Sequence, residues 1–164
     1  MKKILGTIII IASLLMCLTG CSNDELNYTT KEIMDKVYEG FAEGELPMLE
    51  KTDMKTLIDS EMFNLETDLG IKELNYEEAT VSFPTIGSVP HQVVVIKLKE
   101  SEDAATVTAN IKEKINPRKW VCVEAEKVFV ENRGNVIIAV MADEKSAKKI
   151  IAKDIENYIN TFCK

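Results

Sequence analysis

The chain has 164 residues, enough for one ordinary domain and too few for two sizeable ones. Its apolar content of 46% is typical of a folded protein and excludes a disordered or fibrous chain. The formal net charge of −7 excludes the positive surface that nucleic acid or anionic lipid headgroups require.

Residues 1–20 have the pattern of a bacterial signal peptide. Lys2 and Lys3 precede an apolar stretch at 4–18, which is shorter than the roughly twenty residues that a transmembrane helix needs. The stretch ends in Leu18-Thr19-Gly20-Cys21, which resembles the lipobox of bacterial lipoproteins. This resemblance implies cleavage after Gly20 and a diacylglycerol on the Cys21 thiol. An uncleaved signal anchor or a plain secretory signal is the alternative.

The resemblance to lipoproteins also implies a location. Two or more acyl chains hold a protein stably at a membrane, so the chain is expected on the extracytoplasmic face of the cell membrane, anchored through Cys21. Residues 21–28 are polar and acidic and predict a flexible tether, and 29–164 would form a single domain. Without Lys2 and Lys3 the mature part carries 18 basic and 27 acidic residues, a net charge of −9.

The domain is predicted to begin with two helical segments. Thr29 and Glu32 have the spacing of a capping box, and the apolar residues that follow predict a helix ending near Phe41. Asp53 is expected to cap a second, less regular helical stretch that stops at Gly70.

From Asn75 the pattern predicts strands and helices in the order β-β-α-β-β-α. The strands are expected near 75–83, 92–98, 121–130 and 136–141, with a turn at 132–135. Ser101 and Asp143 are expected to cap the two helices, of which the last reaches Phe162. Thr80 and Ser82 alternate with apolar residues, which is typical of a strand with one face in solvent. The fold class is therefore α+β, a two-layer sandwich with about four antiparallel or mixed strands, preceded by N-terminal helices.

The connection between the first two strands is a candidate partner-binding loop. It is longer than the usual hairpin connection, and its two prolines make it stiff, so that its apolar side chains would dock on a partner with little loss of entropy. The alternative is that Ile86 and Val89 fold back on the sheet edge. The loop residues singled out are Pro84, Ile86, Gly87, Val89, Pro90 and His91.

His91 is the single histidine and the first candidate for catalysis. A general base would need a nucleophile such as Ser82 or Ser88 and a carboxylate such as Glu78, and none of these lies in a recognised motif. A polar position on the surface is therefore expected for His91. Trp120 is expected to pack the corner of the core rather than to stack on a ligand.

No metal or cofactor is expected. Glu124 and Glu126 are expected on the solvated face of one strand, and the carboxylates lack the spacing of a metal site; the set considered is Glu77, Glu78, Glu124, Glu126 and Glu144. Cys122, at the start of the third predicted strand, and Cys163, after the last helix, are expected at opposite ends of the sheet, and therefore as free thiols with Cys122 partly shielded.

Several pattern features lie between about Thr52 and the C-terminus: Leu69-Gly70-Ile71, the strand ending at Phe83-Pro84, the strand 93–98, and the strand, turn and helix at 135–162. In these the chain resembles a family of small lipoproteins of Gram-positive bacteria with an uncharacterised domain, domain of unknown function forty-three fifty-eight. The resemblance implies no activity and assigns no functional residue.

The sequence as a whole favours a non-enzymatic, lipid-anchored binding or accessory module with an unknown protein or cell-envelope partner. An extracytoplasmic hydrolase that uses His91 and a structural component of an envelope complex are the alternatives.

Overall fold

The structure is a computed structural model, and it describes residues 28–152. The predicted signal peptide, Cys21, the predicted tether before Tyr28, the part of the predicted last helix after residue 152, and Cys163 lie outside the described residues.

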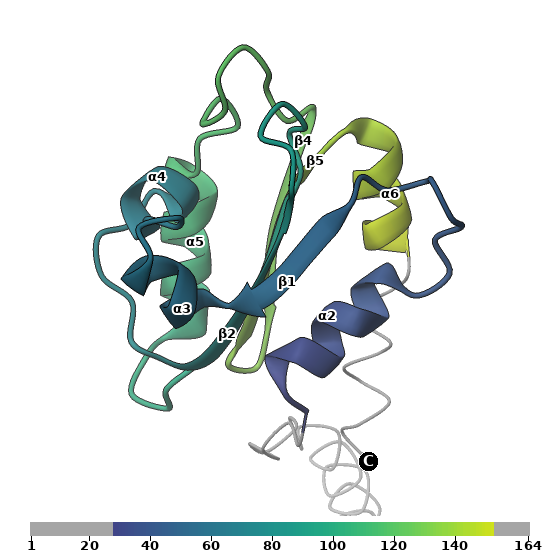
Figure 1. Ribbon diagram of the computed structural model, residues 1–164. Coiled ribbons are helices and arrows are strands. Elements are labelled where there is room, and N and C mark those ends of the chain that lie inside the picture. The colour runs from purple at the N-terminus through teal and green to yellow at the C-terminus, as the bar shows by residue number, and fades with distance from the viewer. Residues whose placement is uncertain (1–27, 153–164) are drawn as a thin grey trace, which may run out of the picture.

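A five-stranded antiparallel sheet forms the centre of the domain, in the order β1-β2-β3-β5-β4 (Figure 1). The α+β class is therefore confirmed, with one strand more than expected. β5 lies inside the sheet and is buried along its whole length, as its unbroken apolar run predicts. The strands are β1 (Leu49–Asp53), β2 (Tyr76–Pro84), β3 (Gln92–Leu98), β4 (Lys127–Arg133) and β5 (Val136–Ala142).

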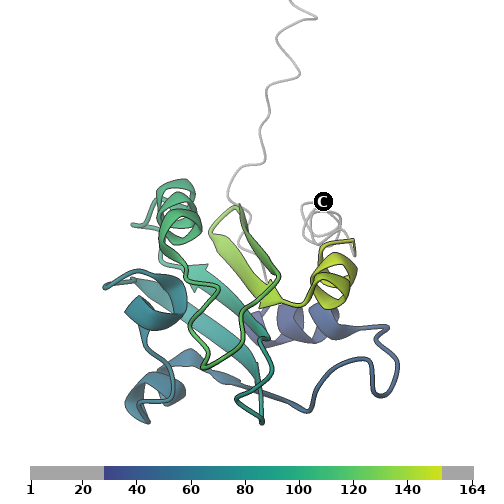
Figure 2. The same cartoon turned by 90° about the horizontal axis from the view of Figure 1, so that it is seen from above.

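Helices cover both faces of this sheet (Figures 1 and 2). The first face is covered by α3 (Met54–Asp59), α4 (Leu65–Leu69) and α5 (Ala104–Lys114), and the second by α2 (Thr30–Tyr38) and α6 (Glu144–Ala152). Each face has its own apolar cluster, centred on residues such as Leu57 and Ile111 on the first and Val37 and Ile150 on the second. The two-layer prediction is wrong: the domain has three layers.

The polar residues of β2 explain this error. Thr80 and Ser82 alternate with apolar residues, and this pattern predicted a face in solvent. Both are buried instead, because α2 lies over them, and the Thr30 hydroxyl lies 2.8 Å from that of Thr80. The Thr80 hydroxyl can be buried at small cost because it has this hydrogen-bond partner, so alternation with threonine does not identify a solvent face.

Several element boundaries also differ from those expected. β1 was not predicted, the first helix ends at Tyr38, and Asp103 rather than Ser101 caps α5. The strand expected at 121–130 begins at Lys127, after a loop at 116–126. Within this loop Cys122 has a φ of +68°, which a strand cannot accommodate.

The predicted caps of the other helices are confirmed. Thr29 and Glu32 form the capping box of α2, and the carboxylates of Asp53 and Asp143 accept backbone N–H groups at the starts of α3 and α6. Gly70 ends α4 in the left-handed region, with a φ of +72°.

Candidate functional site

The loop 85–91 lies at one end of the sheet together with the loop 116–126 and the start of β1 (Figure 1). The strand register explains this grouping: Leu49 pairs with Pro84, and the starts of β3 and β4 both pair with the end of β5. We call residues 47–48, 85–91 and 116–126 the distal end. The chain enters the described domain near the other end, where the Thr30 amide donates to Glu78 in the first half of β2.

Three large apolar side chains project into solvent from the distal end. Met48 is 76% exposed, Ile86 61% and Val121 84%. The segments that carry the first two are joined, because the Thr85 amide donates to the Met48 carbonyl at 3.0 Å. A turn bond from the Val89 amide to the Ile86 carbonyl, at 3.3 Å, shapes the loop further. The distal end therefore presents apolar groups on a hydrogen-bonded frame.

The exposure of the predicted loop changes along its length. Ile86 and Gly87 are exposed, whereas Val89 and Pro90 are half-buried against the domain. Pro84 is buried as the last residue of β2. Of the loop's large apolar side chains, Ile86 is the one that is mostly exposed to solvent.

His91 is buried, with 1% of its surface exposed, and the surface position expected from the sequence is wrong. Its Nε2 lies 2.9 Å from the Tyr38 hydroxyl, in the layer between the sheet and α2. Burial lowers the pKa of His91 to about 4, and the charge of Asp143 opposes this only in part. The imidazole is therefore neutral at pH 7.

The groups that His91 would need for catalysis are not gathered in an accessible site. Ser82 is fully buried, Ser88 is exposed on the loop, and the Glu78 carboxylate accepts the Thr30 amide. The imidazole itself is 1% exposed, so a substrate in solvent could not reach it in this arrangement. In this arrangement His91 packs the base of the loop against Tyr38.

A buried ion pair, which sequence reasoning missed, fixes the other loop of the distal end. Lys119 Nζ donates to Asp68 on α4 and to Gln92 at the start of β3. The side chains of Lys119 and Asp68 are only 12% and 10% exposed. Burial lowers the pKa of Lys119, and the charge of Asp68 opposes that shift. These contacts join residues far apart in sequence, so no local spacing could have indicated them.

Trp120, next to this ion pair, is half-buried against the first apolar cluster, and its predicted place at the corner of the core is confirmed. The Lys119 ammonium lies 4.9 Å from the centroid of its ring. The loop 116–126 is thus held by one charged and one aromatic side chain.

The acidic residues considered for a metal are dispersed. Glu124 and Glu126 lie in the loop before β4, not on a strand face; Glu124 pairs with Arg118, and Glu126 accepts the amide of Glu144. Glu77 pairs with Lys97 at 3.3 Å. Within residues 28–152 no group of three or more acidic, histidine or cysteine side chains is placed to hold a metal ion.

Cys122 is exposed at the tip of the loop, not shielded in the sheet, and has no disulfide partner among residues 28–152. Its expected place at the start of a strand is wrong, because the loop continues to Glu126.

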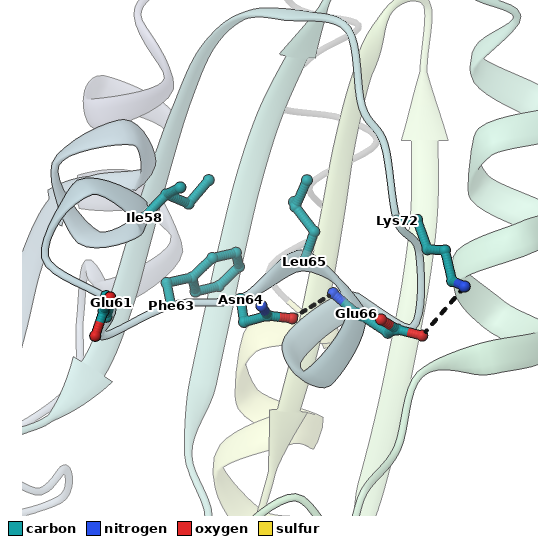
Figure 3. A pocket seen from close by; sticks show the side chains of 7 residues that line it. All are labelled: Ile58, Glu61, Phe63, Asn64, Leu65, Glu66 and Lys72. Carbon is teal, nitrogen blue, oxygen red and sulfur yellow. Dashed lines mark hydrogen bonds and ion pairs between the residues drawn. The ribbon is translucent and has the colours of Figure 1, made fainter.

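A shallow pocket of about 610 Å³ lies apart from the distal end, between α3 and α4 (Figure 3). Its apolar wall is formed by Ile58, Phe63 and Leu65. Its polar rim is formed by Glu61, Asn64, Glu66 and Lys72. No sequence motif pointed to this pocket, because its walls come from two short helices and the turn between them.

Comparisons of the chain with protein-family models, with curated proteins and with solved structures found no match. In the part of the chain that the structure describes, no helix has the length and apolar character needed to cross a bilayer.

Proposed function

We propose that the chain is a lipid-anchored, extracytoplasmic binding module whose distal end docks on another protein of the cell envelope. The observation that carries this proposal is that Met48, Ile86 and Val121 are all exposed and belong to segments at the same end of the sheet, away from the N-terminal entry of the domain. Soluble domains place large apolar side chains in solvent singly, whereas a group of them on one surface is typical of an interaction site.

The position of the distal end fits an anchor on Cys21. A short tether at 22–28 would bring the N-terminal entry of the domain close to the bilayer, and the distal end would then face away from the membrane. The way both loops are held favours binding as well, because a loop backbone fixed by hydrogen bonds or by a buried ion pair loses little entropy on docking. The acidic charge of the mature part disfavours direct contact with anionic headgroups.

Site-specific photocrosslinking in cells tests the docking surface. A photoreactive residue at Ile86 or at Val121 is expected to capture the same envelope protein, whereas one at Glu113, exposed on α5, is the control. Ile86→Asp combined with Val121→Asp is expected to abolish that capture from Met48 while changing the free energy of unfolding by less than about 1 kcal/mol. Equal capture from all positions, or none above the Glu113 control, contradicts the proposal.

The anchor is tested separately. Cys21→Ala is expected to remove the label that a fatty-acid analogue leaves on the chain during growth. Label that persists on this variant would contradict lipidation at Cys21, without bearing on the distal end.

A further inference from the structure

The pocket between α3 and α4 combines an apolar wall with acidic groups at both sides. In Figure 3 the side chains of Ile58 and Leu65 extend from the two helices on either side of the Phe63 ring. Glu61 and Glu66 lie beyond them, in opposite directions. A volume of about 610 Å³ falls in the range of small-molecule sites.

The charges of the rim are unequally neutralised. Glu66 lies 3.8 Å from Lys72, and both side chains are largely exposed, so this pair contributes little. Glu61 has no ion-pair partner among residues 28–152. The side-chain oxygen of Asn64 is already engaged, since it accepts the amides of Glu66 and Thr67 at the start of α4. Among the charged groups of the rim, Glu61 is therefore the one without an ion-pair partner in residues 28–152.

We propose that this pocket binds an organic cation on an aliphatic stem, an amine of the kind found in a lysine side chain or a polyamine. The methylenes of the stem would lie on Ile58 and Leu65, which are half-buried and flank the buried Phe63 ring, and the ammonium would reach Glu61. Long basic side chains divide in this way between apolar surface and a charged end. With two carboxylates and the one ammonium of Lys72, the rim carries a net negative charge that favours a cation over an anion. A neutral apolar ligand would leave the Glu61 charge unpaired. This site is independent of the distal end and adds a second ligand to the proposed module.

Titration of the uniformly ¹⁵N-labelled full chain, purified in detergent, tests the proposal by NMR. The probes are N-acetyl-lysine methylamide and its uncharged analogue N-acetyl-norleucine methylamide. The lysine compound is expected to shift amide signals of residues 58–72 and to bind more tightly than the norleucine compound. Equal affinity for the two compounds, or no shifts at 58–72, overturns the proposal.

Two matched variants separate the site from the net charge of the chain. Glu61→Gln is expected to weaken binding of the lysine compound about two- to fivefold, the range of a solvent-exposed ion pair. Glu113→Gln removes the same charge from the exposed face of α5 and is expected to leave the affinity unchanged. Equal effects of the two variants overturn the proposal.

Spermidine in place of the lysine compound distinguishes the two sources of the cation. Tighter binding of spermidine at residues 58–72 identifies a free polyamine as the ligand, and tighter binding of the lysine compound identifies a peptide side chain. Both results support the site. Either leaves the crosslinking test of the distal end unaffected, so the two proposals fail separately.

Discussion

Replacing Gly70 with alanine is expected to destabilise the domain more than the same change at two other glycines. Gly70 ends α4 with a φ of +72°, and its amide and that of Ile71 donate to the carbonyls of Glu66 and Leu65, at 3.1 and 3.2 Å. A Cβ at this position would come within 2.4 Å of the carbonyl carbon and oxygen of Lys114, at the end of α5. These are backbone atoms, which cannot turn away as a flexible side chain does.

The cost has two parts. A left-handed conformation costs a residue with a Cβ about 1–2 kcal/mol, and forcing a methyl group into a packed contact costs about 1–3 kcal/mol more. Gly70→Ala is therefore expected to lower the free energy of unfolding by about 2–5 kcal/mol. Gly134 has a φ of +51° but no atom within 4 Å of an added Cβ, so Gly134→Ala should show the first part alone. Gly87 has neither constraint, and Gly87→Ala should change stability by less than about 1 kcal/mol.

Urea unfolding followed by the fluorescence of Trp120, the single tryptophan, measures all three variants. The urea midpoint should be highest for Gly87→Ala, lower for Gly134→Ala and lowest for Gly70→Ala. The slope of the free energy of unfolding against urea concentration should be unchanged. If Gly70→Ala were no more destabilising than Gly134→Ala, the close approach of α4 to α5 would be refuted.

Two further predictions concern the buried polar groups. The pKa of His91 is about 4 in the folded chain, below the ordinary 6.5, so between these values the unfolded chain binds a proton that the folded chain does not. The free energy of unfolding should therefore decrease by about 3 kcal/mol as pH falls from 6.5 to 4. In urea unfolding, His91→Gln should make the free energy of unfolding less dependent on pH. An equal pH dependence for the two proteins would contradict the burial of His91. Lys119→Met leaves Asp68 buried without its counter-charge and should cost about 3–5 kcal/mol. Adding Asp68→Asn should recover part of this loss, and simple additivity would show that the two residues do not interact.

The elements that could be predicted from the sequence are those indicated by a pattern of neighbouring residues. β5 is an unbroken apolar run, α2 begins with a capping box, and Gly70 ends α4, and each of these depends on a few adjacent residues. β1 could not be recognised in this way, because it is a short edge strand with charged residues at three of its five positions. Such residues keep an edge from pairing with other chains, and they also remove the apolar pattern of a strand.

The candidate site was predictable only in part. Proline and apolar residues at 84–90 indicated the loop, and Ile86 is exposed as the partner-binding interpretation requires. The contact between Lys119 and Asp68 joins residues that only the fold brings together, and the same holds for His91 and Tyr38. Burial of these groups depends on helices lying over both faces of the sheet, which the polar residues of β2 did not indicate.

The order of the strands has a consequence for the way the chain folds. Direct connections join β2 to β3 and β4 to β5. The strands β3 and β5 also pair, although α5, the loop 116–126 and β4 lie between them in the sequence. Closing that long segment costs chain entropy before any of its contacts form. The step that pairs β3 with β5, and brings Val95 beside Ile138, should therefore limit the folding rate. Substitutions between these two strands should slow folding, whereas substitutions in β4 should mainly speed unfolding.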